Sequence, residues 1–217
     1  LNNNSQFTNN SGATLTNSAD GVLTNSSSLT NHGTLANNKD GNLKNDENGS
    51  VYNFGAFNNG GTWTNAGDIA THGTLHNAGS LHNESTLENY HGGTLANDGT
   101  LTNDKRFHNA KGGTVTNSAV LTNSDTLTNE GALNNNSGGT LTNHHFLNND
   151  GTLTNHSGAT LSNTGNLANL TGGQLTNDGG LNNEKGGALI NNSTVTNTSG
   201  GTLNNSGTLN NASGTLN

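Results

Sequence analysis

The sequence predicts an all-β protein, a three-sided parallel β-helix (β-solenoid) of 11 coils with about 20 residues per coil. Three observations support this prediction. Thirty-three aliphatic or aromatic residues, here called anchors, recur along the whole chain at spacings of 6 or 8, with one final spacing of 7. Of the 32 anchors that are followed by a residue at +2, all but Ile69 have Asn there. The residue two before each anchor is Gly, Ala or Ser almost everywhere.

Each anchor is expected to lie in one short strand. An even spacing keeps every anchor on the same face of an extended chain, because side chains alternate sides with period two. The typical unit is Gly-Thr-Leu-Thr-Asn, as in residues 99–103. Its two β-branched Thr residues face outward, where they favour the pleated surface, and Leu faces inward. A helical period would not keep the anchors on one side.

Three strands are expected to form one coil. Every third anchor recurs at steps of 18, 20 or 22 residues. The bulky exceptions at the position two before the anchor, Lys105, Asp125 and His145, are likewise 20 residues apart. This periodicity outweighs the composition, 26% hydrophobic and 9% charged, which by itself is typical of a disordered chain.

The recurrent Asn is expected to close each strand and to stack from coil to coil. It has the same parity as the anchor, and it tolerates the left-handed backbone region at a corner. Amides stacked about 4.8 Å apart can donate and accept hydrogen bonds along the axis. Gly two before the anchor leaves room for neighbouring backbones and tolerates the φ that a corner needs. One of the three ladders would contain Asn103, Asn123, Asn143, Asn163 and Asn183.

The repeats cover residues 1–217 as a single continuous array, without a visible cap at either end. Open solenoid ends present unpaired strand edges that recruit other chains. We therefore expect either a segment of a longer array or a filament subunit that self-associates end to end.

Composition excludes several classes of function. The chain has no Cys, so it has neither disulfides nor thiolate metal sites. Its six basic residues and formal charge of −8 argue against nucleic acid as a partner. It has no apolar run long enough for transmembrane insertion. Ser, His and Asp occur without a nucleophile elbow or a pocket-forming insertion, so we expect no enzyme and no cofactor.

The Gly-Thr-Leu-Thr-Asn units, and runs such as Asn197 to Leu203, resemble the repeats of filamentous-haemagglutinin-like exoproteins and autotransporter-type β-helical surface proteins of Gram-negative bacteria. The resemblance covers the whole chain. It implies a right-handed β-helix, secreted or on the cell surface, that acts as an adhesin, a fibre or a stalk. The structural alternative is a left-handed β-helix with a strict hexapeptide period, whereas 11 intervals here are eight residues long.

Departures from the repeat are densest on the face formed by the second anchor of each coil, around Phe107, Leu127 and Leu147. There charge replaces Gly, and one aromatic residue falls at an outward position. These side chains suit a glycan or protein of a host surface; the alternative is that Lys105 and Asp125 simply pair along the ladder. The candidate contact patch consists of Lys105, Arg106, His108, Asp125, His144, His145 and Phe146.

Metal and ice binding are further alternatives with weaker patterns. The nine His do not share a column, although metal sites need several converging ligands, so no metal site is expected. Asp20 and Asp40 occupy equivalent corners one coil apart and could bind a weak cation. Outward Thr-x-Thr pairs resemble those of ice-binding solenoids, but Ala132 and Asn134 interrupt them.

Overall fold

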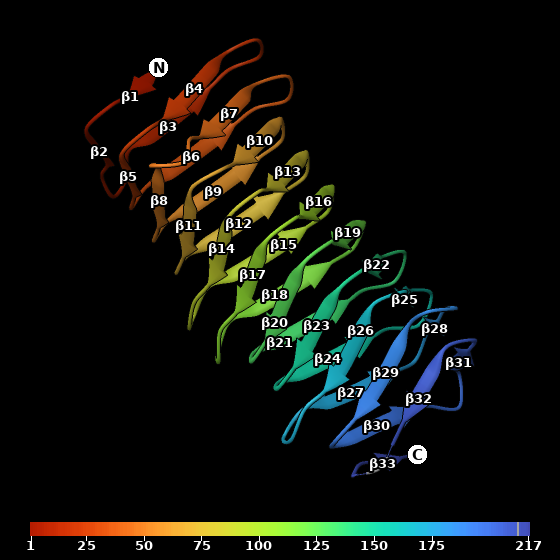
Figure 1. Cartoon of the computed structure of the whole chain (residues 1–217). Helices are drawn as coiled ribbons and strands as arrows, with labels where there is room; N and C mark the ends of the chain where they lie inside the picture. Colours follow the sequence, from red (N-terminus) through yellow and green to blue (C-terminus); the bar gives the residue numbers. More distant parts are fainter. Residues whose placement is uncertain (212) are drawn as a thin grey trace.

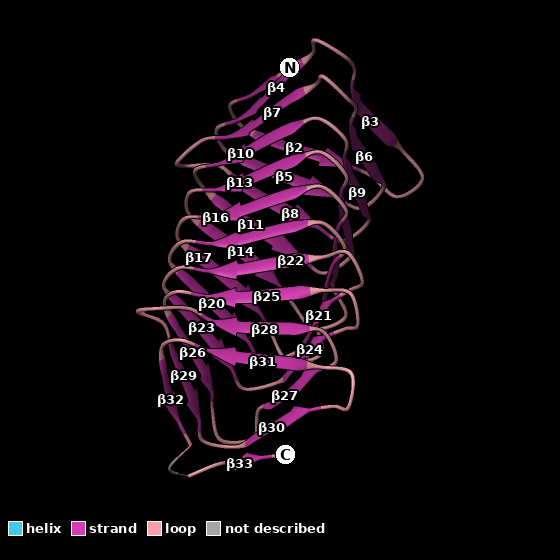
Figure 2. Ribbon diagram, turned by 90° about the vertical axis from the view of Figure 1, so that its right-hand side faces the viewer, coloured by secondary structure: helices cyan, strands magenta, loops and turns pink. Residues whose placement is uncertain are grey.

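The computed structural model describes residues 1–211 and 213–217 as a β-solenoid of 33 strands, with no helix in these ranges (Figures 1 and 2). The strands form three parallel sheets of 11 strands, here called sheets A, B and C. Sheet A contains β1 (Asn2–Asn3), β4 (Val22–Asn25), β7 (Asn42–Asn45), β10 (Thr62–Asn65), β13 (Ser80–Asn83), β16 (Thr100–Asn103), β19 (Val120–Asn123), β22 (Thr140–Asn143), β25 (Thr160–Asn163), β28 (Gly180–Asn183) and β31 (Thr202–Asn205).

Sheet B contains β2 (Gln6–Asn9), β5 (Ser28–Asn31), β8 (Ser50–Asn53), β11 (Asp68–Thr71), β14 (Thr86–Asn89), β17 (Arg106–Asn109), β20 (Thr126–Asn129), β23 (Phe146–Asn149), β26 (Asn166–Asn169), β29 (Ala188–Asn191) and β32 (Thr208–Asn210). Sheet C contains β3 (Thr14–Asn17), β6 (Thr34–Asn37), β9 (Ala56–Asn59), β12 (Thr74–Asn77), β15 (Thr94–Asn97), β18 (Thr114–Asn117), β21 (Ala132–Asn135), β24 (Thr152–Asn155), β27 (Gln174–Asn177), β30 (Thr194–Asn197) and β33 (Thr215–Leu216).

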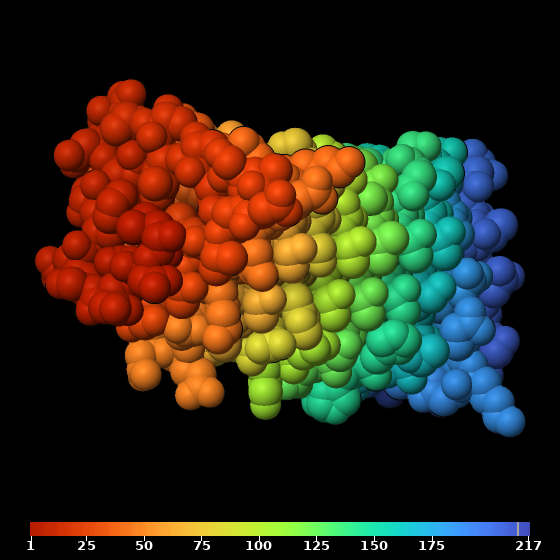
Figure 3. Space-filling view, turned by 90° about the horizontal axis from the view of Figure 1, so that it is seen from above, coloured from red at the N-terminus to blue at the C-terminus, as the bar shows by residue number. Residues whose placement is uncertain are grey.

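Each strand from β1 to β30 pairs in parallel with the strand three places later in the chain. The register places anchor over anchor and Asn over Asn, as in Leu101 with Leu121 and Asn103 with Asn123. The predicted fold class, three strands per coil and 11 coils, is therefore confirmed. Figure 3 shows the coils stacked in sequence order along one axis. No helix in the described ranges is long and apolar enough to cross a membrane.

The anchors form one continuous core along the axis. Most are fully buried, and only those near the two ends, such as Phe7 and Leu209, are partly exposed. The single Trp of the chain, Trp63, is 0% exposed and stacks on Phe57 with ring centroids 4.1 Å apart. Its indole N–H is buried without a hydrogen-bond partner.

The predicted Asn ladder is confirmed. From Asn103 to Asn183 each Nδ2 donates to the Oδ1 of the next Asn at 2.7–2.8 Å. The same Nδ2 also reaches main-chain carbonyls: that of Asn123 donates to Phe146 at 2.8 Å and to Asp125 at 3.1 Å. The amides are buried, so these bonds satisfy polar groups that would otherwise destabilise the interior by about 1–3 kcal/mol each.

The ladder of sheet B is interrupted at Thr71. Asn53 Nδ2 donates to Thr71 Oγ1 at 3.0 Å, but Thr71 has no side-chain amide that could donate to the next Asn of the ladder. In the next coil Asn89 Oδ1 is buried without a hydrogen-bond partner. The single exception in the sequence pattern is thus a defect in the buried hydrogen bonding.

Among the described residues, the left-handed backbone conformation is not found at the Asn two after the anchor or at the Gly two before it, so this part of the prediction is wrong. Asn at +2 ends its strand in extended conformation, and the left-handed residues instead lie five after the anchor, within eight-residue intervals. They are Gly12, Gly92, Gly112, Gly138, Gly158, Gly172 and Gly186, together with Asp20 and Asp40 at φ of 60° and 65°. Gly two before the anchor is required by close stacking: a Cβ on Gly151 would lie 2.1 Å from the carbonyl oxygen of Gly131 in the coil before.

Candidate functional site

The candidate contact patch lies on and beside sheet B, over three consecutive coils. Arg106, Thr126 and Phe146 occupy the same outward position of β17, β20 and β23. Lys105, Asp125 and His145 precede them at the corner between sheets A and B. The structure therefore places the predicted residues on one side of the solenoid, but their contacts divide them into two clusters.

The first cluster is centred on Glu88 of β14. The Arg106 guanidinium and the Tyr90 hydroxyl both donate to the Glu88 carboxylate. His108 lies 3.9 Å from Glu88 and 3.4 Å from Glu130 of the next coil. Partial burial pushes the pKa of Glu88 upward, but the hydrogen bonds from Tyr90 and Arg106 outweigh it, so this pKa lies below its usual range. The bond to Glu88 in turn raises the pKa of Tyr90.

The second cluster joins Asp125, His145 and Phe146. His145 Nδ1 lies 3.4 Å from Asp125 Oδ1, and the rings of His145 and Phe146 meet edge to face with centroids 4.0 Å apart. Phe146 is 41% exposed. Within residues 1–211 and 213–217 the ion pair of Asp125 is formed with His145, and no ion pair of Lys105 is found.

His144 belongs to neither cluster. Its Nδ1 lies 3.0 Å from Thr164 Oγ1, at the equivalent corner position of the next coil. His144 bonds to Thr164 of the coil after it and His145 pairs with Asp125 of the coil before it, so the two side chains make separate contacts.

Sequence reasoning missed a column of four stacked rings at the corner between sheets B and C. The ring centroids of His32 and Phe54 are 5.1 Å apart, those of Phe54 and His72 4.9 Å, and those of His72 and Tyr90 4.5 Å. All four residues lie three after an anchor of sheet B. Four aromatic or imidazole side chains at that one offset in successive coils were the signal that could have revealed the column.

Histidine–carboxylate pairs join successive coils in the middle of the array. His76 Nε2 lies 2.9 Å from Asp98 Oδ2, and His82 Nε2 lies 2.6 Å from Asp104 Oδ2. With the pairs of His108 and His145 described above, each of four consecutive coil interfaces has at least one such contact. The hydrogen bond from His82 holds the pKa of Asp104 below its usual range. These pairs link coils but do not converge on one point.

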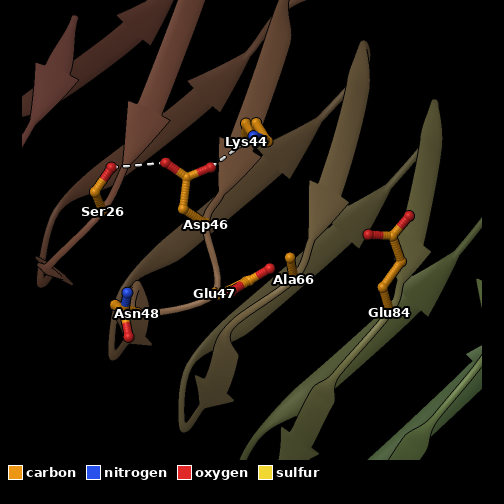
Figure 4. Close-up of a pocket in the computed structure, with 7 residues that line it drawn as sticks. All are labelled: Ser26, Lys44, Asp46, Glu47, Asn48, Ala66 and Glu84. Carbon is orange, nitrogen blue, oxygen red and sulfur yellow. Dashed lines mark hydrogen bonds and ion pairs between the residues drawn. The ribbon is translucent and has the colours of Figure 1, made fainter.

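A shallow hollow lies at the corner between sheets A and B, on the coils that lead up to the contact patch, from Ser26 to Glu84 (Figure 4). Asp46 accepts hydrogen bonds from Ser26 at 2.7 Å and from Lys44 at 2.8 Å, as the dashed lines show. The bond from Lys44 is the main reason that the pKa of Asp46 lies below its usual range. Three of the polar residues that line the hollow are therefore paired with one another.

The structure adds no support for the alternative metal and ice-binding sites. Over the described ranges no three His, Asp or Glu side chains converge as metal ligands. Asp20 and Asp40 stack through a backbone bond of 3.2 Å from Asp20 N–H to the Asp40 carbonyl. On sheet C the register puts Ala132 and Asn134 directly between Thr114 and Thr116 of one neighbouring strand and a Thr pair of the other. A continuous Thr array for ice is therefore broken on this face.

Comparison with known proteins links the chain to adhesin-type repeats. Residues 168–217 match a family model described as haemagglutinin repeat. None of the curated proteins matches the sequence. A solved structure of the TibC-catalysed hyper-glycosylated TibA55-350 fragment is 20% identical, with 100% of this chain and 89% of that chain covered and a TM-score of 0.27. The family match confirms the resemblance to filamentous-haemagglutinin-like β-helical proteins that the repeat motifs indicated.

Proposed function

We propose, from the haemagglutinin-repeat match and the solenoid architecture, that this chain forms a non-enzymatic adhesive stalk or fibre at the bacterial cell surface or in secreted form. One observation carries the proposal. Three uninterrupted sheets run the length of the described chain, so that a repetitive sequence yields a straight rod. Such a rod separates a contact surface from whatever holds its base, which is what a stalk requires.

The interior supports a structural role rather than catalysis. The buried polar groups are almost all Asn amides, and each is used in stacking one coil on the next. The titratable side chains lie outside the core, and several of them pair with neighbours on adjacent coils. Catalytic groups commonly have shifted pKa values inside a concave site that binds substrate. The interior of the solenoid is instead filled by the packed anchors and the stacked Asn amides.

Adhesion can be tested with beads coated with the purified chain. We expect coated beads to bind epithelial cells or extracellular matrix more strongly than beads coated with an unrelated acidic protein of similar size. The matched control is the same chain unfolded in urea before coupling, because it keeps composition and charge but loses the ordered surface. Equal binding by folded and unfolded chains would argue against an adhesive solenoid.

The proposal extends to end-to-end association of copies, because parallel coils offer the same three strand edges to a neighbour above and below. Electron micrographs and sedimentation at increasing concentration would test it. Axial rods that lengthen with concentration are expected. A single short species at all concentrations would contradict the filament.

A second candidate function is a binding module that uses the patch on sheet B. The specific observation in its favour is the cluster in which Glu88 holds Tyr90, Arg106 and His108 together. Hydroxyl-rich ligands are commonly recognised by such combinations of an aromatic ring with charged hydrogen-bonding groups. In this second function the chain would supply the contact as well as the stalk.

A further inference from the structure

Basic side chains gather on and beside β17, the sheet B strand of the coil that follows the end of the ring column, in a chain that is otherwise acidic. Only six residues are Lys or Arg, and the formal charge is −8. Three of the six, Lys105, Arg106 and Lys111, lie on or next to β17, and all three are exposed. The sixth coil therefore carries a local excess of positive groups on its sheet B side.

The ring column ends in this same place. Tyr90 is its last member, stacked on His72 with an interplanar angle of 4°. One coil further, the equivalent position is Ala110, and the one after that is Glu130. One face of the Tyr90 ring therefore stacks on His72, and the next position of the column on its other side holds only the methyl group of Ala110. The column presents a terminal aromatic face.

Hydrogen-bonding side chains flank this position on both sides. On the sheet B side, Arg106 and Tyr90 share the Glu88 carboxylate, which fixes the tilt of the Tyr90 ring. On the corner side, Lys111 is exposed, and the His91 ring covers Gly112: a Cβ there would lie 2.5 Å from the imidazole. An aromatic platform, a hydrogen-bonded positioning network and exposed cationic donors therefore occur together.

This combination has the chemistry of a site for an acidic sugar. The C–H groups on one side of a pyranose ring carry partial positive charge and pack against the electron-rich face of an aromatic ring. A carboxylate or sulfate on the sugar would complement Lys111 and Arg106, which bind anions through charge-assisted hydrogen bonds. A neutral sugar would offer no anionic group to Lys111, whereas Arg106 already pairs with Glu88. Charge complementarity therefore selects the anionic sugar.

We propose that Tyr90, Arg106 and Lys111 form a binding site for an acidic pyranose, which stacks on Tyr90 above Ala110 as a fifth member of the ring column. The proposal rests on the second candidate function and narrows it to one end of the patch. Asp125, His145 and Phe146 pair with one another one and two coils after Arg106 and take no part. Lys105 lies at the other end of β17, at the corner between sheets A and B, and takes no part.

The test uses the purified chain and three soluble probes that share one core: sialyllactose, sulfated lactose and lactose. Saturation-transfer NMR and titration are expected to show binding of at least one acidic probe, with upfield-shifted sugar protons from the Tyr90 ring current, and much weaker binding of lactose. Sialyllactose alone would assign a carboxylate, and sulfated lactose alone a sulfate. Binding should weaken as salt is raised, because the cationic groups are exposed.

Variants locate the site without disturbing the core. Tyr90→Ala should weaken binding about tenfold, the scale of one lost ring contact. Tyr90→Phe should keep much of the binding. Ala110→Phe should abolish binding by occupying the column position, and it is compatible with the fold because Phe54 fills the equivalent position three coils earlier. Lys111→Ala should weaken the acidic probes, whereas Lys185→Ala, an exposed lysine on a distant coil, should have no effect.

The proposal fails if lactose binds as well as the acidic probes, if none of the three binds, or if Tyr90→Ala and Ala110→Phe bind like the wild type. These results are independent of the bead assay. Coated beads that adhere while all three probes fail would leave the adhesive stalk intact and remove this site.

Discussion

The interrupted ladder at Thr71 makes a quantitative prediction about stability. In the same coil, Asn65 and Asn77 donate to Asn83 and Asn97 at 2.8 and 2.7 Å. They also donate to main-chain carbonyls of the next coil at 3.0 and 2.9 Å. Thr71 provides neither bond.

The substitution Thr71→Asn should restore the missing contacts. The new amide would donate to Asn89 Oδ1, which is now buried without a partner, and to a main-chain carbonyl of the next coil. Satisfying one buried acceptor is worth about 1–3 kcal/mol. Every other position of this kind accommodates Asn, so overpacking is not expected. We therefore expect Thr71→Asn to raise the free energy of unfolding by about 1–3 kcal/mol.

Urea unfolding followed by Trp63 fluorescence is the appropriate assay. Trp63 is the only Trp, it is fully buried, and it lies in the same coil as Thr71. Coil stabilities in a solenoid depend mainly on their nearest neighbours, so this probe reports the coil that is changed. The matched control, Thr71→Val, removes the hydroxyl that accepts from Asn53 and should destabilise the protein by about 1 kcal/mol. If Thr71→Asn unfolds at the same urea concentration as the wild type or earlier, the ladder does not stabilise the coils as argued.

Three further predictions concern the stacking of coils. Gly151→Ala should destabilise the chain by about 1–3 kcal/mol, since its Cβ would meet a carbonyl oxygen at 2.1 Å, whereas Gly200→Ala has no contact under 3.9 Å and should unfold like the wild type. Asn123→Ala should cost about 1–3 kcal/mol by leaving a buried amide oxygen in the next coil unpaired, measured as a lower urea midpoint. The hydrogen bond from His82 lowers the pKa of Asp104 in the folded state. The stability that this bond contributes is therefore complete above the unfolded pKa of about 3.9 and is lost as pH falls below that value. Asp104→Asn should show a smaller drop in melting temperature between about pH 5 and pH 3 than the wild type, and an equal drop would contradict the assignment.

The fold could be predicted from sequence because the buried positions leave little choice. Leu101 and Leu121 must lie over each other once burial and the period of two fix which side of each strand faces inward. Asn103 and Asn123 follow at a constant offset, so their stacking is implied by the same register. Even the defect at Thr71 was visible as the one residue that breaks the pattern.

The outward contacts could not be predicted in the same way. An exposed carboxylate chooses among partners whose energies differ by less than about 1 kcal/mol. Asp125 could thus be placed beside both Lys105 and His145, and only the structure shows that it pairs with His145. The left-handed Asp20 and Asp40 depend on the path of the inserted corner residues, which the spacing of anchors does not specify.

Function in such a chain has to be sought where the repeat is broken. Stacked amides, anchors and close-packed glycines fix the positions that point inward, and a change at any of them disturbs the adjacent coils. The outward strand positions and the corners face water and can vary with little effect on the fold. Selection for binding can therefore act only there. Two of the six basic residues, Arg106 and Lys111, flank the end of the ring column at Tyr90. This is the clearest such departure, and for this reason the sheet B face is the place to look for a ligand.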